Sequence, residues 1–359
     1  MTRAEAITAA LLARMQAAGA QPVATPILQP AETLLDLYGE DIRARAYVTQ
    51  DPALGEMMLR PDFTVPVVQA HMQGGAEPAR YCYAGPVFRK QTQARAREYL
   101  QVGFELFARE DAAQADAEVF ALFADLLRGH DLRPVTGDIG ILKAAVAGLE
   151  TSAERKAALM RHIWRPSRFR ALLERMGGQG PLARARAALV DDLARAPASK
   201  LIADAGQMVG LRSEDEIAAR IQTLIADAAT PPIPRAQVAA LESVLALEAP
   251  APEALSALRA TGWDALRPAL DRLEARLDAL SKAGLDVASL PFEASFGRTT
   301  MEYYDGFVFG FVAARADLPP VATGGRYDAL TAVLGQGRAI PAVGGVIRPE
   351  TLAALEGCA

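Results

Sequence analysis

Segments with strand character lie near both ends of this 359-residue chain, and a block with helical periodicity separates them. Residues 151–284 are rich in Ala, Leu, Arg and Glu, and their apolar residues recur at helical spacing. Runs typical of strands precede this block and return after residue 285. This order predicts an α+β fold. Residues 1–150 and 285–359 form one core, an antiparallel sheet flanked by helices, and residues 151–284 form a mainly helical insertion.

Two local patterns predict how the chain begins. Thr2 and Glu5 form a capping box, and Gly19 ends the helix that follows. Val23–Leu28 then predicts a strand that contains Pro26, and strands tolerate proline only at an edge, a bulge or an interface.

Charge and cysteine content restrict the classes of function. The net charge of −5 argues weakly against a dedicated nucleic-acid binder, because such proteins gather Lys and Arg. Cys82 and Cys358 are the only cysteines, and no CxxC or HxxxH spacing occurs, so we expect neither a zinc site nor another metal or cofactor. The first residues fit neither a signal peptide nor a membrane span, and we expect a cytoplasmic protein.

The most informative strand is Tyr99–Phe107, in which side chains alternate between two faces. Gln101 and Glu105 share one face, and Gly103 between them lacks a side chain. This pattern predicts a recess that is floored by backbone and flanked by an amide and a carboxylate, both able to accept hydrogen bonds from N–H donors. A polar strand that faces solvent is the alternative.

A basic loop joins this strand to the strand Arg80–Phe88. Its cations are Arg89, Lys90, Arg95 and Arg97. Guanidinium groups in such a hairpin can bind a phosphate or carboxylate through two hydrogen bonds. A solvated hairpin tip is the alternative, and it is the commoner explanation of such residues.

The sequence GPVFRK followed by REYLQVGFE resembles motif 2 of the histidyl-tRNA synthetase family, which belongs to the class II aminoacyl-tRNA synthetases. The resemblance implies the class II fold. It places Arg89 where the family has the arginine for the ATP α-phosphate, and it places Gln101 and Glu105 where the family binds histidine.

Three further segments match the same family in order along the chain. The sequence LRPDFT ends at Thr64 and places Asp62 where the family receives the substrate amino group, with Thr64 lining the same site. The sequence EYYDGFVF implies that Tyr303 and Tyr304 lie near the imidazole. The sequence GGRYD, Gly324–Asp328, matches a second histidine-specific segment.

The chain departs from the family where adenylation requires cations. Thr299 stands in the place of the catalytic arginine, and Arg298 is one position away, which on a strand points to the opposite face. The family pattern G-L-E-R-L is replaced by Arg348–Leu352, so Thr351 stands where motif 3 has its arginine. Lys90–Thr92 replaces H-E-R in the motif 2 loop. Because each lost cation costs orders of magnitude in rate, we expect no adenylation.

Because it keeps the residues of the histidine pocket and lacks the residues for adenylation, the chain resembles the ATP phosphoribosyltransferase regulatory subunit family. The sequence also ends eight residues after Thr351, without an anticodon-binding domain. The resemblance implies a subunit without catalysis of its own, required for the first step of histidine biosynthesis. Its partner would be a short-form catalytic subunit and its effector histidine, with neither tRNA nor membrane. It also implies a homodimer through the segment around Pro26.

Two alternatives remain open from the sequence. The first is an active histidyl-tRNA synthetase or a paralogue that adenylates histidine for another acceptor, with Arg298 turned into the site. The second is an accessory protein that binds nucleic acid, which would need a basic surface. The sequence leaves open whether histidine binds the inherited pocket or a subunit interface.

Overall fold

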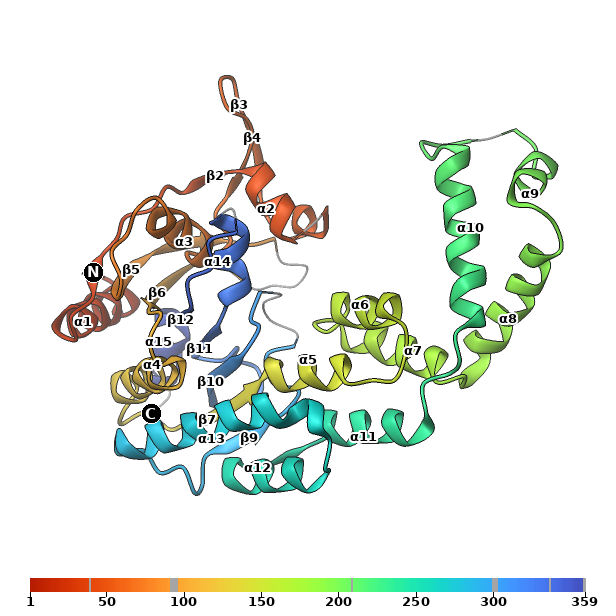
Figure 1. Cartoon of the computed structure of the whole chain (residues 1–359). Helices are drawn as coiled ribbons and strands as arrows, with labels where there is room; N and C mark the ends of the chain where they lie inside the picture. Colours follow the sequence, from red (N-terminus) through yellow and green to blue (C-terminus); the bar gives the residue numbers. More distant parts are fainter. Residues whose placement is uncertain (39, 91–95, 208, 299–302, 336, 358–359) are drawn as a thin grey trace. The chain divides into compact units, whose positions relative to one another are not determined.

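The computed structural model describes residues 1–38, 40–90, 96–207, 209–298, 303–335 and 337–357 (Figure 1). The chain forms two compact units. The first comprises residues 1–141, 246–262 and 267–359, and the second comprises residues 142–245 and 263–266. This division differs from the predicted insertion 151–284, because β8 (Glu248–Pro250), α12 (Ala251–Ala260) and α13 (Arg267–Lys282) belong to the first unit.

In the described part of the chain, the first unit contains a nine-stranded sheet in the order β1-β5-β6-β12-β11-β10-β7-β9-β8. Besides β8, its strands are β1 (Gln21–Pro22), β5 (Ala79–Phe88), β6 (Glu98–Phe107), β7 (Leu132–Asp138), β9 (Pro291–Glu293), β10 (Phe307–Ala313), β11 (Ala322–Arg326) and β12 (Ala342–Ile347). Most neighbours are antiparallel, as predicted, but β1–β5 and β7–β9 are parallel. The sheet is therefore mixed.

Helices cover both faces of this sheet. On one face α1 (Arg3–Ala17), α4 (Ala112–Leu126) and α15 (Pro349–Glu356) contact β6. On the face that carries Glu105, α3 (Thr64–Met72) packs beside α14 (Asp328–Leu334). The capping box of α1 is confirmed, since Thr2 and Glu5 exchange hydrogen bonds. A three-layer core results.

A smaller sheet in the order β2-β4-β3 lies near the start of the chain. Its strands are β2 (Leu28–Pro30), β3 (Val48–Asp51) and β4 (Gly55–Leu59), with α2 (Ala31–Tyr38) and a 3₁₀ helix (Glu40–Ala44) between them. The predicted strand Val23–Leu28 is wrong, because residues 23–27 are irregular and only Leu28 of this segment belongs to a strand. Pro26 therefore lies outside any strand.

Buried ion pairs join distant parts of the first unit. Arg276 on α13 pairs with Asp116 on α4 and Asp138 on β7, both at 2.9 Å. Arg326 on β11 pairs with the second oxygen of Asp116 at 2.7 Å. All four side chains are buried, and each carboxylate faces a guanidinium, so the desolvation cost is offset by charge-assisted hydrogen bonds. This network explains why α13 belongs with the sheet.

The second unit is helical. Its helices are α6 (Ala153–Arg161), α7 (Pro166–Met176), α8 (Gly180–Ala194), α9 (Ala198–Asp204), α10 (Glu214–Ala229) and α11 (Arg235–Leu245), and α5 (Ile139–Ala147) leads into them. Phe169 and Leu241 lie in its core. Arg155 ties α6 to α10 through Asp227 at 2.6 Å.

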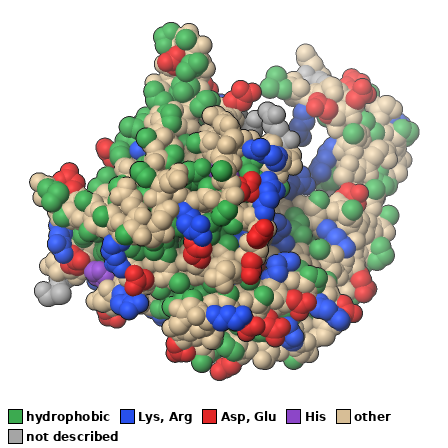
Figure 2. Space-filling view, turned by 60° about the vertical axis from the view of Figure 1, so that its left-hand side comes forward, with side chains coloured by type: hydrophobic (Ala, Val, Ile, Leu, Met, Phe, Trp, Pro, Cys, Tyr) green, Lys and Arg blue, Asp and Glu red, His purple; other side chains and the backbone are tan. Residues whose placement is uncertain are grey.

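The surface carries charges of both signs. Acidic and basic side chains lie interspersed on the face shown in Figure 2. Among the helices of the described residues, none combines the length and apolar character that crossing a membrane requires.

Candidate functional site

The strand β6 brings two predicted site residues to one face of the large sheet. Gln101 and Glu105 lie four positions apart, so both point to the same side. Each is only 1% exposed, and every residue from Gln101 to Phe107 is buried. The alternative of a strand that faces solvent is therefore wrong.

The recess predicted above Gly103 is filled by an aromatic ring. A Cβ atom at Gly103 would lie 2.2 Å from the ring of Tyr83, which is the residue opposite on β5. Tyr83 also stacks on Phe63, with 4.4 Å between ring centroids. The glycine thus admits the tyrosine ring, and the predicted open floor is wrong.

Glu105 is held by three hydroxyl groups. Tyr83 donates to its Oε1 at 2.8 Å, Thr64 donates to the same oxygen at 3.1 Å, and Tyr327 donates to Oε2 at 2.6 Å. Burial raises the pKa of Glu105 to about 7, although these hydrogen bonds oppose the shift and nearby Asp62 adds to it. A cationic or N–H-bearing ligand would favour the ionised form of this carboxyl.

Asp62 lies next to the start of α3 and is buried. Burial raises the pKa of its carboxyl, whereas the charge of Arg89 and the N–H groups of Val65 and Thr64 lower it. Its Oδ1 is buried without a hydrogen-bond partner among the described residues. This oxygen is free to accept a bond from a ligand.

Gln101 is the least satisfied side chain of the site. Neither its amide oxygen nor its amide nitrogen has a hydrogen-bond partner within the described ranges, although both are buried. Leaving a buried polar atom unpaired costs about 1–3 kcal/mol, so native structures rarely do it without a reason. A ligand with both a donor and an acceptor would supply that reason.

Tyr303 and Tyr304 lie at the edge of the same cavity, ahead of β10. The strand that follows them, β10, begins at Phe307. Tyr303 donates to the Thr64 hydroxyl at 3.3 Å, and the two tyrosine rings lie 4.9 Å apart. Burial raises the pKa of Tyr304, so its hydroxyl stays protonated at neutral pH.

Two arginines complete the lining. Arg89 donates from Nε to the carbonyl of Pro61 at 2.8 Å. Arg348 follows the last residue of β12 and donates to the carbonyl of Pro320 at 2.8 Å and to the hydroxyl of Thr323 at 3.2 Å. Burial lowers the pKa of Arg348, and the charge of Arg89 lowers it further. The two guanidinium groups therefore lie within electrostatic reach of each other.

The cavity brings together all seven side chains that the sequence predicted for the site. These are Asp62, Thr64, Arg89, Gln101, Glu105, Tyr303 and Tyr304. Six more lining residues were not predicted: Thr323, Tyr327, Gly344, Gly345, Val346 and Arg348. The segment GGRYD pointed to Tyr327, whereas nothing local marked Arg348. The cavity volume is about 20 Å³, room for roughly one water molecule.

The residues at or beside the positions where the family has adenylation residues differ in their burial and location. Thr351 is buried within α15, and Arg298 is buried without lining the cavity. Lys90 donates to the carbonyl of Arg43 at 3.0 Å. Thr299, Gln91, Thr92 and Arg95 lie outside the described residues.

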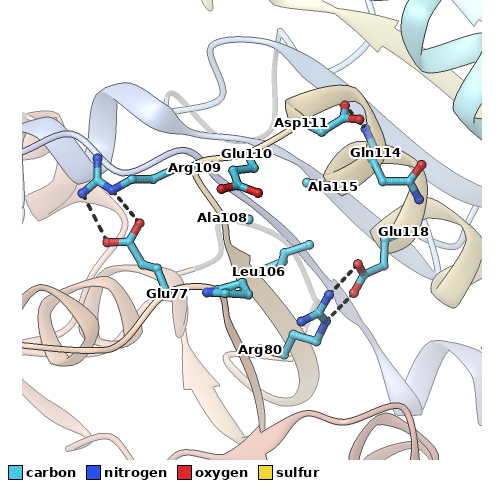
Figure 3. Close-up of a pocket in the computed structure, with 11 residues that line it drawn as sticks. Glu77, Arg80, Leu106, Ala108, Arg109, Glu110, Asp111, Gln114, Ala115 and Glu118 are labelled. Carbon is cyan, nitrogen blue, oxygen red and sulfur yellow. Dashed lines mark hydrogen bonds and ion pairs between the residues drawn. The ribbon is translucent and has the colours of Figure 1, made fainter.

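A larger cavity of about 430 Å³ lies where β6 ends and α4 begins (Figure 3). Four of its charged side chains form two ion pairs: Arg80 with Glu118 at 2.5 Å, and Arg109 with Glu77 at 2.8 Å. The smaller cavity, with unsatisfied buried groups, is therefore the better candidate for a specific ligand site.

Comparison with known proteins shows the family of this chain. The family model described as "Histidyl-tRNA synthetase" matches residues 1–352. An ATP phosphoribosyltransferase regulatory subunit of Agrobacterium fabrum is 34% identical over 97% of this chain and 96% of its own length. The subunit of that name from Brucella canis is 34% identical over 99% of this chain and 98% of its own length.

Solved structures share the fold. The chain resembles an ATP phosphoribosyltransferase regulatory subunit/histidyl-tRNA synthetase from Bacillus halodurans, with a TM-score of 0.69 and 20% identity over 98% of this chain and 79% of the other. It also resembles a histidine–tRNA ligase subunit from Alicyclobacillus acidocaldarius, with a TM-score of 0.61 and 22% identity over 99% of this chain and 93% of the other. The fold is thus that of class II synthetases, and the chain belongs to the ATP phosphoribosyltransferase regulatory subunit family.

Proposed function

We propose that this chain is a regulatory subunit, without catalysis of its own, of a short-form ATP phosphoribosyltransferase. In this proposal the first step of histidine biosynthesis requires it, and histidine inhibits that step through it. The observation that carries the proposal is the buried site around Gln101 and Glu105, whose polar groups can form hydrogen bonds with a small ligand. A site that recognises the end product of a pathway, without chemistry attached, acts as a sensor.

The site suits histidine in its donors and acceptors. The amine and the imidazole of histidine offer N–H groups, and Asp62, Glu105 and the amide of Gln101 can accept them. Thr64, Arg89, Tyr303 and Tyr304 complete the proposed binding set.

Binding requires the cavity to widen, because about 20 Å³ cannot hold an amino acid. Side chains or segments that line it must therefore move. A ligand can shift an equilibrium only through different affinities for two states. A site with a narrow and a wider form provides two such states, and we propose that the catalytic partner responds to the difference.

We further propose that adenylation is lost. Thr299 and Thr351 stand where the family has arginines, and such cations stabilise the charge that develops on the phosphates. One observation favours the alternative of an active synthetase: Arg89 and Arg348 still place two cations at the cavity. Histidine-dependent exchange between ATP and pyrophosphate decides between them. Background exchange supports the regulatory subunit, and robust exchange supports the enzyme.

The net charge of −5, and the charges of both signs on the face shown in Figure 2, speak against a dedicated nucleic-acid binder. The proposed partner is a protein instead. Co-expression with a short-form catalytic subunit, followed by size-exclusion chromatography, tests this. We expect the two chains to elute together at a mass above either alone. Separate elution at micromolar concentration would refute the partnership.

A further inference from the structure

Arg348 occupies a position that the strand pairing fixes. In β12 and β6, Gly344 lies opposite Glu105, and Ile347 lies opposite Val102. Arg348 follows Ile347, so it lies at the level of Gln101, four residues from Gly344. Four residues along a strand span about 13 Å. Arg348 and Glu105 thus mark two ends of the site along the strand direction.

The guanidinium of Arg348 carries an uncompensated charge. Its partners are a carbonyl and a hydroxyl, both neutral, and no carboxylate in the described part of the chain pairs with it. Arg89 places a second positive charge nearby. A partly buried cation such as Arg348 is costly without a counter-charge, so this end of the cavity favours an anion.

The opposite end carries the opposite sign. Asp62 lies close enough to Glu105 to raise the pKa of the Glu105 carboxyl, and Thr64 donates a hydrogen bond to Glu105. Gln101 lies at the same level as Arg348, and both of its amide atoms are unpaired among the described residues. A cavity with the Glu105 carboxylate at one end and the Arg348 guanidinium at the other matches an α-amino acid that carries a basic side chain.

The sequence pattern supports a relocated cation. The family segment G-L-E-R-L has glycine where this chain has Arg348, and arginine where this chain has Thr351. Thr351 is buried within α15, whereas Arg348 lies before the helix and lines the cavity. One arginine is therefore lost from the helix and one is gained at its entrance.

We propose that Arg348, together with Arg89, forms the subsite for the carboxylate of the amino-acid effector. This inference rests on the proposed function, since it concerns the same ligand. Charge-assisted hydrogen bonds to a carboxylate contribute strongly to affinity, so removing either partner weakens binding by about tenfold or more.

Calorimetry with three probes tests the subsite. The probes are L-histidine, histamine, which lacks only the carboxylate, and ATP. The wild-type chain should bind histidine about tenfold or more tightly than histamine. Arg348→Gln should lose most of this preference through weaker histidine binding, with histamine affinity unchanged, and Arg348→Lys should retain part of it. Arg109→Gln, whose side chain contacts Glu77 and Ala339 away from the site, is the matched control.

Each outcome decides the inference. If Arg348→Gln binds histidine as tightly as the wild-type chain, the subsite is refuted while the effector function stands. If ATP binding, and not histidine binding, depends on Arg348, the subsite takes nucleotide phosphate and the inference is wrong in its ligand. If the wild-type chain does not bind histidine, the effector function and the subsite fall together. If substitution unfolds the chain, a wild-type preference for histidine over histamine below about twofold still refutes the subsite.

Discussion

Gly344 lies directly opposite Glu105 in the pairing of β12 with β6, and a Cβ atom at this glycine would lie 1.6 Å from the Glu105 Oε2. No side chain longer than hydrogen fits there unless the carboxylate moves. The three hydroxyl groups that hold the carboxylate oppose such a movement. The strand pairing thus fixes the position of the central acid of the site.

Gly344→Ala should therefore destabilise the fold by about 1–3 kcal/mol and weaken histidine binding. Chemical denaturation and calorimetry measure the two effects. Gly357→Ala is the control, because a Cβ there meets the carbonyl of Ala353 at an ordinary 3.5 Å. Equal stability and equal affinity in the two variants would contradict the geometry at Glu105.

The pKa of Glu105 predicts how stability depends on pH. Its folded pKa of about 7 exceeds the ordinary value of 4.5, so between these values the folded chain binds more protons than the unfolded chain. Stability therefore falls as pH rises through this window, by about 3 kcal/mol in total. Glu105→Gln removes this pH-dependent loss of stability, because glutamine does not ionise. Relative to the wild-type chain, it should gain stability between pH 5 and pH 8 in denaturation experiments. A difference that stays constant with pH would show that the pKa of Glu105 is not raised.

The Gln101 side chain should lower the stability of the fold and strengthen ligand binding. Gln101→Met keeps the length of the side chain but removes two buried, unpaired polar atoms. We expect stability to rise by about 1–3 kcal/mol in the absence of ligand and histidine affinity to fall about tenfold. Loss of both stability and affinity would instead mean that the amide is bonded within the protein.

The small sheet predicts self-association. Ile27, Leu28, Val48 and Leu54 are exposed aliphatic side chains on or beside it. Apolar groups gathered in this way mark interaction surfaces, and the resemblance to class II synthetases implies a dimer through this segment. Light scattering at micromolar concentration should give about twice the mass of one chain, and Leu54→Asp should weaken the dimer. Leu189→Asp, at an exposed leucine of the second unit, is the control. A monomeric wild-type chain would refute this prediction.

Local sequence patterns predicted those elements whose signals lie within their own segments. The capping box of α1 and the strand pair β5–β6 both follow from short-range signals. In contrast, β11 has the sequence ATGGR, which locally favours a turn, and it becomes a strand only because β10 and β12 pair with it on both sides. Pro134 and Gly137 likewise disfavour a strand locally, so the sequence of β7 does not predict a strand.

Local sequence patterns likewise predicted only part of the site. Gln101 and Glu105 were predictable because alternation along one strand places them together. Arg348 enters the cavity through the pairing of β12 with β6, across more than 200 residues of sequence, and Tyr83 fills the recess over Gly103 from the neighbouring strand. Asp116 and Arg276, 160 residues apart, likewise carry no local signal of their contact.

The rate of phosphoribosyl-ATP formation by a short-form catalytic subunit, measured with and without this chain and then titrated with histidine, tests the central claim most directly. We expect the chain to raise the turnover of the catalytic subunit and histidine to suppress it, with Glu105→Ala needing at least about tenfold more histidine. A rate that is the same with and without the chain, and that histidine leaves unchanged, would contradict the regulatory function even though the fold stands.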